Sequence, residues 1–155
     1  MDDSLRETAA RLLAKNRYVV LATADEAGAP WASPVWFAHR GVTTIVWVSS
    51  PDARHSRALA ADPRIAVTVF DSSVVPGHGT AFYGRGTARM SADADLVDHL
   101  ETFNAEADRQ GLPPWDADRV TAPARHRLYV ATLEEVSLLL DDGGPDERVP
   151  VDLDA

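Results

Sequence analysis

The 155-residue chain contains no cysteine. This absence excludes disulfide bonds, thiolate nucleophiles and zinc sites that depend on cysteine. Lysine is nearly absent as well, because Lys15 stands alone beside fourteen arginines. We interpret this imbalance as a genomic composition bias rather than as a sign of function.

Long apolar segments are also missing from the sequence. No apolar run approaches the roughly 20 residues that a membrane-spanning helix requires. The N-terminal segment MDDSLRETAARLLAKNR is charged and lacks the apolar stretch of a signal peptide. The sequence therefore predicts a soluble, cytoplasmic protein that does not associate with a membrane.

Positive charge is scarce, since the formal net charge at pH 7 is −9. A nucleic acid is an unsuitable partner, because no long basic stripe is present to neutralise its phosphates. The acidity is concentrated at the end of the chain, where residues 141–155 (DDGGPDERVPVDLDA) hold six acidic residues against Arg148. We predict one domain over residues 1–140 and, after it, an acidic C-terminal tail over residues 141–155 that is mobile or loosely attached.

Several familiar catalytic and binding motifs are missing too. The five histidines lack a ligand spacing such as H-E-x-x-H, so no dedicated metal site is expected. There is no G-x-S-x-G turn, which argues against a serine hydrolase of that type. The glycines of PGHGTAFYGRG (76–86) do not form the G-x-G-x-x-G fingerprint of a dinucleotide-binding βαβ unit. A mobile hairpin loop is the simpler interpretation of this segment.

What the sequence does contain is a series of short strands with few helices between them. The spacing of Leu5, Ala9, Leu12 and Leu13 predicts a helix over residues 4–16. Apolar runs and turn residues then predict the remaining elements: strands over 18–24, 31–40 and 43–50, a short helix, strands over 64–71 and 80–90, a helix from Ser91 or Asp93 to Gly111, and a strand over 127–141.

This order of elements favours an antiparallel barrel. The connections between strands are mostly short, and alternating strand–helix units are absent, so the predicted fold is a β-barrel with helices at its ends and corners. The strand over 43–50 is nearly continuously apolar from Ile45 to Val48. One of its faces belongs to the core, and the other needs a helix, a partner subunit or a ligand to cover it. Glycines at 84 and 86 indicate a bend or bulge in the strand over 80–90.

The segment SSPDARHSRALAADPR (49–64) places positive charge at an unusual position. Ser50 can act as the N-cap of the short helix, and Pro51 suits the first helical position. Arg54 and His55 then follow near the helix start, where the helix dipole favours anions over cations. Backbone N–H groups at a helix start, together with an arginine, form a phosphate site without overall basicity. The pattern predicts an anchor for the anionic end of a ligand.

The segment GAPWASPVWFAHRGVTTIVWVSSPDARHSRALAADPRIAVTVFD (28–71) resembles the FMN-binding split β-barrel superfamily, typified by pyridoxamine 5′-phosphate oxidase. The shared features are a Ser/Pro-rich strand, an apolar strand ending in serine, a basic pair at a short helix, and Asp-Pro-Arg leading into a strand. The resemblance covers residues 5–90 well and the C-terminal strand more loosely. It implies a mainly β (α+β) fold, an antiparallel split β-barrel with short helices, which forms an intertwined homodimer with cofactor sites at the subunit interface.

The resemblance assigns nine residues of this chain to cofactor binding. In the family, consecutive strands supply backbone groups to the flavin ring, and basic residues at the short helix hold the phosphate. The corresponding positions are Ser33, Pro34, Val35 and Trp36 for the ring, Val48 and Ser49 for the ribityl–phosphate region, and Arg54 and His55 for the phosphate, with Ser50 as a further candidate for a phosphate contact. His55 departs from the usual Arg-Lys pair, because a histidine is only fractionally charged near neutral pH. Arg57 and Arg64 are expected to be structural or solvent-facing.

Side-chain directions restrict these assignments. Ser33 and Trp36 lie on opposite faces of an ideal strand, so at most one of them directs its side chain at the ring. Ser33 is the better candidate, because a hydroxyl on an apolar strand needs a hydrogen-bond partner. Of Ser49 and Ser50, one is expected to contact the phosphate while the other caps the helix.

These assignments predict a homodimeric, FMN-dependent oxidoreductase that transfers hydride or electrons between a reduced donor and a small organic substrate. The cofactor supplies the chemistry, and no side chain in the matched segments is an obvious acid, base or nucleophile, so no catalytic residue is assigned. The alternatives are a reductase of the same fold that uses the deazaflavin coenzyme, a flavin- or haem-binding protein without turnover, and a split barrel that has lost its cofactor.

Overall fold

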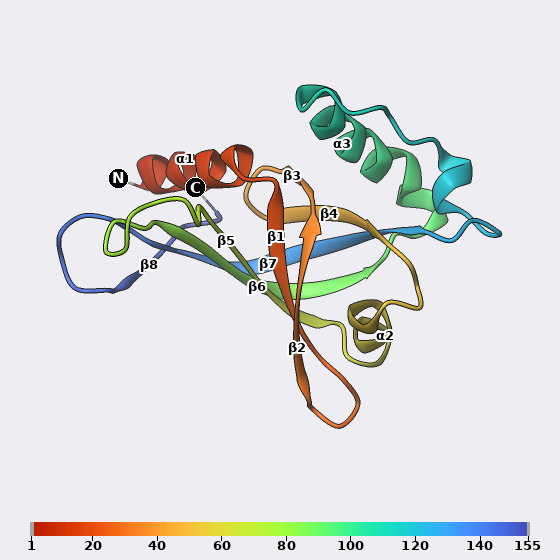
Figure 1. Cartoon of the computed structure of the whole chain (residues 1–155), viewed down its shortest axis with the longest axis horizontal. Coiled ribbons are helices and arrows are strands. Elements are labelled where there is room, and N and C mark those ends of the chain that lie inside the picture. Colours follow the sequence, from red (N-terminus) through yellow and green to blue (C-terminus); the bar gives the residue numbers. More distant parts are fainter. Residues whose placement is uncertain (1, 155) are drawn as a thin grey trace.

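The computed structural model describes residues 2–154, which form an eight-stranded antiparallel sheet curled into a barrel-like body with three α-helices around it (Figure 1). The helices are α1 (Asp2–Lys15), α2 (Arg54–Ala61) and α3 (Leu96–Arg109), and two 3-10 turns cover Asp93–Asp95 and Ala117–Val120. The strands are β1 (Tyr18–Ala24), β2 (Pro30–Trp36), β3 (Ala38–Arg40), β4 (Thr44–Ser49), β5 (Arg64–Phe70), β6 (Ala81–Met90), β7 (Arg127–Leu139) and β8 (Arg148–Pro150). The predicted antiparallel, mainly β fold with short helices is confirmed.

The two edge strands of the sheet are neighbours in the sequence. The order is β2-β1-β5-β6-β7-β4-β3, with β8 paired to β7. The edge strands β2 and β3 are separated by Phe37 alone, so the prediction of one continuous strand over residues 31–40 is wrong at this position. Phe37 is buried in the core, and its N–H donates to the carbonyl of Arg17 at 3.4 Å. The chain therefore leaves β1 here and begins to pair with β4.

The main core lies inside the barrel. Leu21, Trp47 and Phe82, from three different strands, are almost fully buried in it. Helix α1 closes one end with the apolar face predicted from the sequence, since Ala9 and Leu13 are buried in this cluster. Within residues 2–154 we find no helix long and apolar enough to cross a membrane.

A second, smaller core lies between α3 and the outer face of the barrel. Leu100 and Phe103 of α3 are buried here together with Val46 of β4 and Val130 of β7. The expectation that both faces of β4 are covered is confirmed, because its neighbours Ile45 and Trp47 belong to the main core. The cover on the outer face is a helix of the same chain.

The C-terminal segment corrects one sequence-based expectation. Residues 148–153 are not loosely attached, because β8 pairs with the end of β7 and the Val151 N–H donates to the Val136 carbonyl at 2.9 Å. Val151 is 6% exposed and belongs to the main core, and the Leu153 carbonyl accepts a hydrogen bond from Arg6 at 3.1 Å. Apolar residues between the acids attach this segment to the barrel, and net charge alone did not reveal them.

Candidate functional site

The structure divides the predicted cofactor residues between two faces of the sheet. Side chains alternate along β4, so Trp47 and Ser49 face the barrel side while Val46 and Val48 face α3. The same alternation separates Ser33 from Trp36 on β2, as predicted. The barrel-side group comprises Ser33, Val35 and Ser49, with Arg54 and His55 from α2; the outward group comprises Trp36 and Val48; Pro34 is exposed on β2, and Ser50 lies in the turn before α2.

The start of α2 differs from the prediction. The helix begins at Arg54 with Ala53 as its N-cap, not at Ser50. Residues 50–53 instead form a turn in which the Ala53 N–H donates to the Ser50 carbonyl at 3.1 Å, and the Asp52 N–H donates to Ser50 Oγ at 3.2 Å. Asp52 therefore lies outside the first helical turn, which contains no acidic residue. Arg54 and His55 are the first two helical residues, beside backbone N–H groups that lack intrahelical partners.

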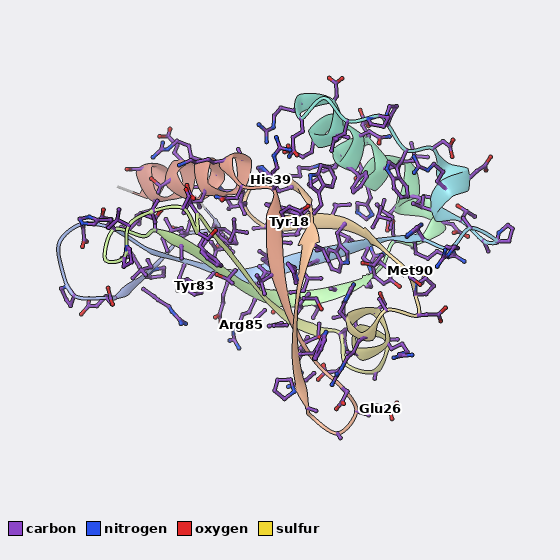
Figure 2. All side chains as sticks on the ribbon, viewed as in Figure 1. Tyr18, Glu26, His39, Tyr83, Arg85 and Met90 are labelled. Atoms are coloured by element: carbon purple, nitrogen blue, oxygen red, sulfur yellow. The ribbon has the colours of Figure 1, made fainter. Side chains whose placement is uncertain are left out.

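Arg54 is exposed and is supported by an aromatic ring. Its guanidinium carbon lies 3.9 Å from the centre of the Trp31 ring on β2, a cation–π contact. Both Arg54 and Arg57 line a cleft of about 590 Å³ between α2 and the tip of the β1–β2 hairpin. Figure 2 shows Glu26 at this tip, beyond the body of the barrel. The hairpin thus holds one face of the Arg54 guanidinium while its N–H groups remain available to an anion.

His55 is tied to Ser49 on the neighbouring strand. The distance from Ser49 Oγ to His55 Nε2 is 2.8 Å, which is a hydrogen bond between a buried hydroxyl and a half-buried ring. Burial lowers the pKa of His55 below its ordinary value of 6.5, so the ring is predominantly neutral at pH 7. The pair therefore offers hydrogen bonds to a ligand, and the positive charge at the start of α2 comes from Arg54.

The other two arginines of this region, Arg64 and Arg57, have different surroundings from Arg54. Arg64 donates to Asp62 through both Nε and Nη2, with a shortest distance of 2.7 Å. These hydrogen bonds lower the pKa of Asp62 to about 2. The structural role predicted for Arg64 is confirmed. Arg57 is exposed on the next turn of α2, as expected from the sequence.

The outward group belongs to a separate cavity, which we call the aromatic pocket. It has a volume of about 330 Å³ and is lined by Trp36, Val48, Phe103, Leu112, Trp115 and His126, together with Ala107 and Pro113. Trp36 and Phe103 meet edge to face, with ring centres 4.9 Å apart, and Phe103 and Trp115 do so at 6.1 Å. The pocket joins β2 and β4 to α3 and to the loop that follows it.

A chain of hydrogen bonds orients Trp36. Its Nε1–H donates to Gln110 Oε1 at 2.9 Å, and the Gln110 amide donates in turn to Glu106. Arg109 also donates to Glu106, with Nε 3.0 Å from Oε2, and reaches the Ala14 carbonyl of α1. Sequence reasoning missed Glu106 and Gln110. The available signal was an acidic residue on the apolar face of α3, between Phe103 and the end of the helix.

The Glu106 carboxylate makes the free energy of unfolding depend on pH in the acid range. Burial raises the pKa of Glu106, but hydrogen bonds from Arg109 and Gln110 outweigh it, so the pKa lies below the ordinary 4.5. A lowered pKa means that the ionised group stabilises the fold above pH 4.5 and that this contribution is lost as the pH falls through the folded-state value. We expect Glu106→Gln to reduce the free energy of unfolding at pH 7 and to flatten its decline below pH 4.5, as measured by urea unfolding.

The matched control for this prediction is Glu135→Gln, because Glu135 pairs with Arg85 on the exposed surface. Exposed pairs contribute little to stability. The free energy of unfolding of Glu135→Gln at pH 7 should therefore stay close to that of the wild type. Equal losses at pH 7 in both variants would contradict the role assigned to Glu106.

The described side chains contain no group of three or more His, Asp or Glu residues arranged to hold a metal ion. At the start of α2 the chemistry is that of anion binding instead. The available groups are the Arg54 guanidinium, helix N–H groups and the Ser49–His55 pair, and these suit a phosphate.

The sequence profile described as pyridoxamine 5′-phosphate oxidase matches residues 5–139. Among curated protein sequences, none matches this chain. Solved structures share its fold. A haem-binding protein from Mycobacterium smegmatis is 23% identical with a TM-score of 0.69, and the match covers 92% of this chain but only 55% of that protein.

Two further structures have names that refer to flavin-type cofactors. An F420 reductase is 24% identical, with a TM-score of 0.59, and the match covers 82% of this chain and 94% of that one. An FAD-binding protein from Mesorhizobium loti is 18% identical, with a TM-score of 0.64, and the match covers 85% of this chain and 91% of that one. These similarities establish the split-barrel fold.

Proposed function

Because this chain belongs to the pyridoxamine 5′-phosphate oxidase family, we propose that it is a flavin-dependent oxidoreductase that binds FMN at a homodimer interface. The bound flavin supplies hydride or electron transfer to a small organic substrate, and the protein binds and orients it. The observation that carries this proposal is the start of α2, where Arg54 and the Ser49–His55 pair lie beside unpaired helix N–H groups with no acid in the first turn.

Phosphate is the part of FMN that these residues fit best. Arg54 provides a permanent charge, and Trp31 supports its guanidinium from one side. Burial lowers the pKa of His55, so before a ligand binds the ring offers a hydrogen bond and Arg54 carries the positive charge. Val35 and the buried hydroxyl of Ser33 lie on the barrel side of β2, and in this proposal they contact the rest of the cofactor.

The homodimer is supported by the exposed edge of the sheet. β2 is an edge strand, and its residues Pro30, Trp31, Ala32 and Pro34 are all exposed although most are apolar. Trp31 alone leaves 42% of its surface exposed. An unpaired apolar edge is an interaction surface, and we propose that a second copy of this chain covers it.

A second candidate function is a reductase that uses the deazaflavin coenzyme. This coenzyme carries a phosphodiester tail that is longer than the phosphate of FMN. The cleft of about 590 Å³ is lined by Arg54 and Arg57 on the α2 side and by Asp25 and Glu26 on the hairpin side, and such a tail would have space to continue along its α2 side.

The test is a cofactor titration of purified protein, followed by visible absorbance and flavin fluorescence. We expect saturable binding of FMN and much weaker binding of riboflavin, which lacks the phosphate. Tighter binding of the deazaflavin coenzyme than of FMN would favour the second candidate. A protein that binds haem alone, or none of these compounds, would overturn the oxidoreductase proposal. Light scattering during size-exclusion chromatography tests the dimer by giving the mass in solution.

A further inference from the structure

The aromatic pocket has no part in the phosphate site, although two of the predicted cofactor residues line it. Trp36 and Val48 face α3 and lie on the opposite side of the sheet from the Ser49–His55 pair. We propose that this pocket binds a small, neutral, planar ring compound. The further statement that this compound is the substrate rests on the proposed function, whereas the binding itself does not.

The arrangement of the rings points to a planar ligand. Three contacts along the pocket wall are close to perpendicular: Trp36 with Phe103 at 79°, Phe103 with Trp115 at 79°, and Trp115 with His126 at 81°. Walls that meet at right angles allow an inserted ring to stack on one side chain while its edge meets another, and both geometries are favourable for aromatic groups.

The size of the pocket limits the ligand to one or two rings. Its volume is about 330 Å³, at the low end of the roughly 300–1,000 Å³ range of ligand pockets. An apolar cavity of about 150 Å³ accommodates benzene. A fused two-ring compound therefore matches the aromatic pocket, whereas an extended chain does not.

The lining of the pocket requires a neutral ligand. None of the described residues that line it is acidic, and none is arginine or lysine. Trp36 Nε1–H is already donated to Gln110. The side-chain hydrogen-bonding groups that remain in the lining are the indole N–H of Trp115 and the exposed His126 ring at the edge of the pocket. Arg119 stacks on the Trp115 ring but does not line the pocket, so a charged ligand would lose hydration here without a counter-charge among the lining residues.

The pocket is also held in shape without a ligand. Asn104 Oδ1 accepts a hydrogen bond from the Trp115 backbone N–H at 2.8 Å, and Asn104 Nδ2 donates to the Trp115 carbonyl at 2.7 Å. These two hydrogen bonds fix the backbone of the loop. Arg119 stacks on the Trp115 ring at 3.6 Å. Walls that are already ordered lower the entropic cost of binding, so a small compound can bind without a rearrangement of α3.

The experiment measures binding to the full, cofactor-free chain by isothermal titration calorimetry. The two ligands are 2-naphthol, which is neutral at pH 7, and 2-naphthoate, which is anionic. We expect saturable binding of 2-naphthol and at least tenfold weaker binding of 2-naphthoate. Trp115→Ala should abolish 2-naphthol binding, and Trp31→Ala, a tryptophan outside the pocket, should leave it unchanged. His126→Ala, a change at an exposed residue, removes a hydrogen-bonding group and the ring that meets Trp115 edge to face, so it should weaken 2-naphthol binding at least 2- to 10-fold.

Several outcomes would overturn the proposal: no binding of 2-naphthol, equal binding of the two compounds, or equal effects of the Trp115 and Trp31 substitutions. If a partner subunit fills the pocket, 2-naphthol will not bind and Trp115→Ala will reduce the mass in solution. FMN titration of the same variants separates the two proposals. Binding of 2-naphthol by a chain that fails to bind FMN would contradict only the proposed function. Loss of both ligands in Trp115→Ala would mean that the cofactor ring occupies this pocket.

Discussion

Replacing Gly86 by alanine is expected to destabilise the protein by about 3 kcal/mol or more, because the new methyl group has no space. A Cβ atom at this position would lie 1.9 Å from the Thr132 carbonyl oxygen and 2.8 Å from Leu133 Cα. Both obstacles are backbone atoms of the paired strand β7, so neither can rotate away. Gly86 also borders the register shift between β6 and β7, where Glu134 of β7 is the extra residue opposite the glycine-containing stretch.

Urea unfolding followed by tryptophan fluorescence measures this loss. The matched control is Gly79→Ala, where the nearest atom to a new Cβ is a side-chain carbon of Val74 at an ordinary 3.7 Å. That variant should stay within about 0.5 kcal/mol of the wild type. If Gly86→Ala proves as stable as Gly79→Ala, the close approach of β6 to β7 is wrong.

Replacing Arg54 by alanine is expected to weaken FMN binding by ~1.5–3 kcal/mol, the amount typical of a lost charge-assisted hydrogen bond. This corresponds to about a 10- to 150-fold rise in the dissociation constant. Arg54 provides the positive charge at the start of α2, since burial lowers the pKa of His55. Because the Arg54 side chain is exposed and contacts the Trp31 ring, its removal should leave folding intact.

Fluorescence titration with FMN and with riboflavin tests this role. Arg57→Ala is the control, because Arg57 is an exposed arginine on the same helix and lines the same cleft. We expect Arg57→Ala to change FMN affinity little and Arg54→Ala to leave riboflavin affinity unchanged. Similar losses in the two variants would indicate general attraction of an anion to the cleft instead of a phosphate contact by Arg54.

Much of the fold was predictable because its local signals are strong. The strand predicted over residues 18–24 coincides with β1, and the helix predicted from Ser91 or Asp93 to Gly111 contains α3. The glycine pair at 84 and 86 indicated the irregularity between β6 and β7, although its extra residue, Glu134, lies on β7. In each case the relevant interactions repeat along a short stretch of chain, so the pattern is visible without knowledge of the fold.

The candidate site was predictable only in part. The sequence identified the residues around α2 but placed the start of the helix at Ser50, because serine and proline are favoured at helix starts. In the structure Ser50 closes a turn before the helix instead. The resemblance treated Trp36 and Ser49 as parts of one site, yet they lie on opposite faces of the sheet.

By itself, the sequence determined the succession of strands and helices, the antiparallel barrel and the position of the positive charge at α2, since these follow from periodicity and local chemistry. Only the tertiary structure decided which side chains meet. Trp31 supports Arg54, and Gln110 orients Trp36, across 23 and 74 positions of the chain. The physical reason is that such contacts depend on strand register and helix packing, which bring distant residues together and leave no periodic trace in the sequence.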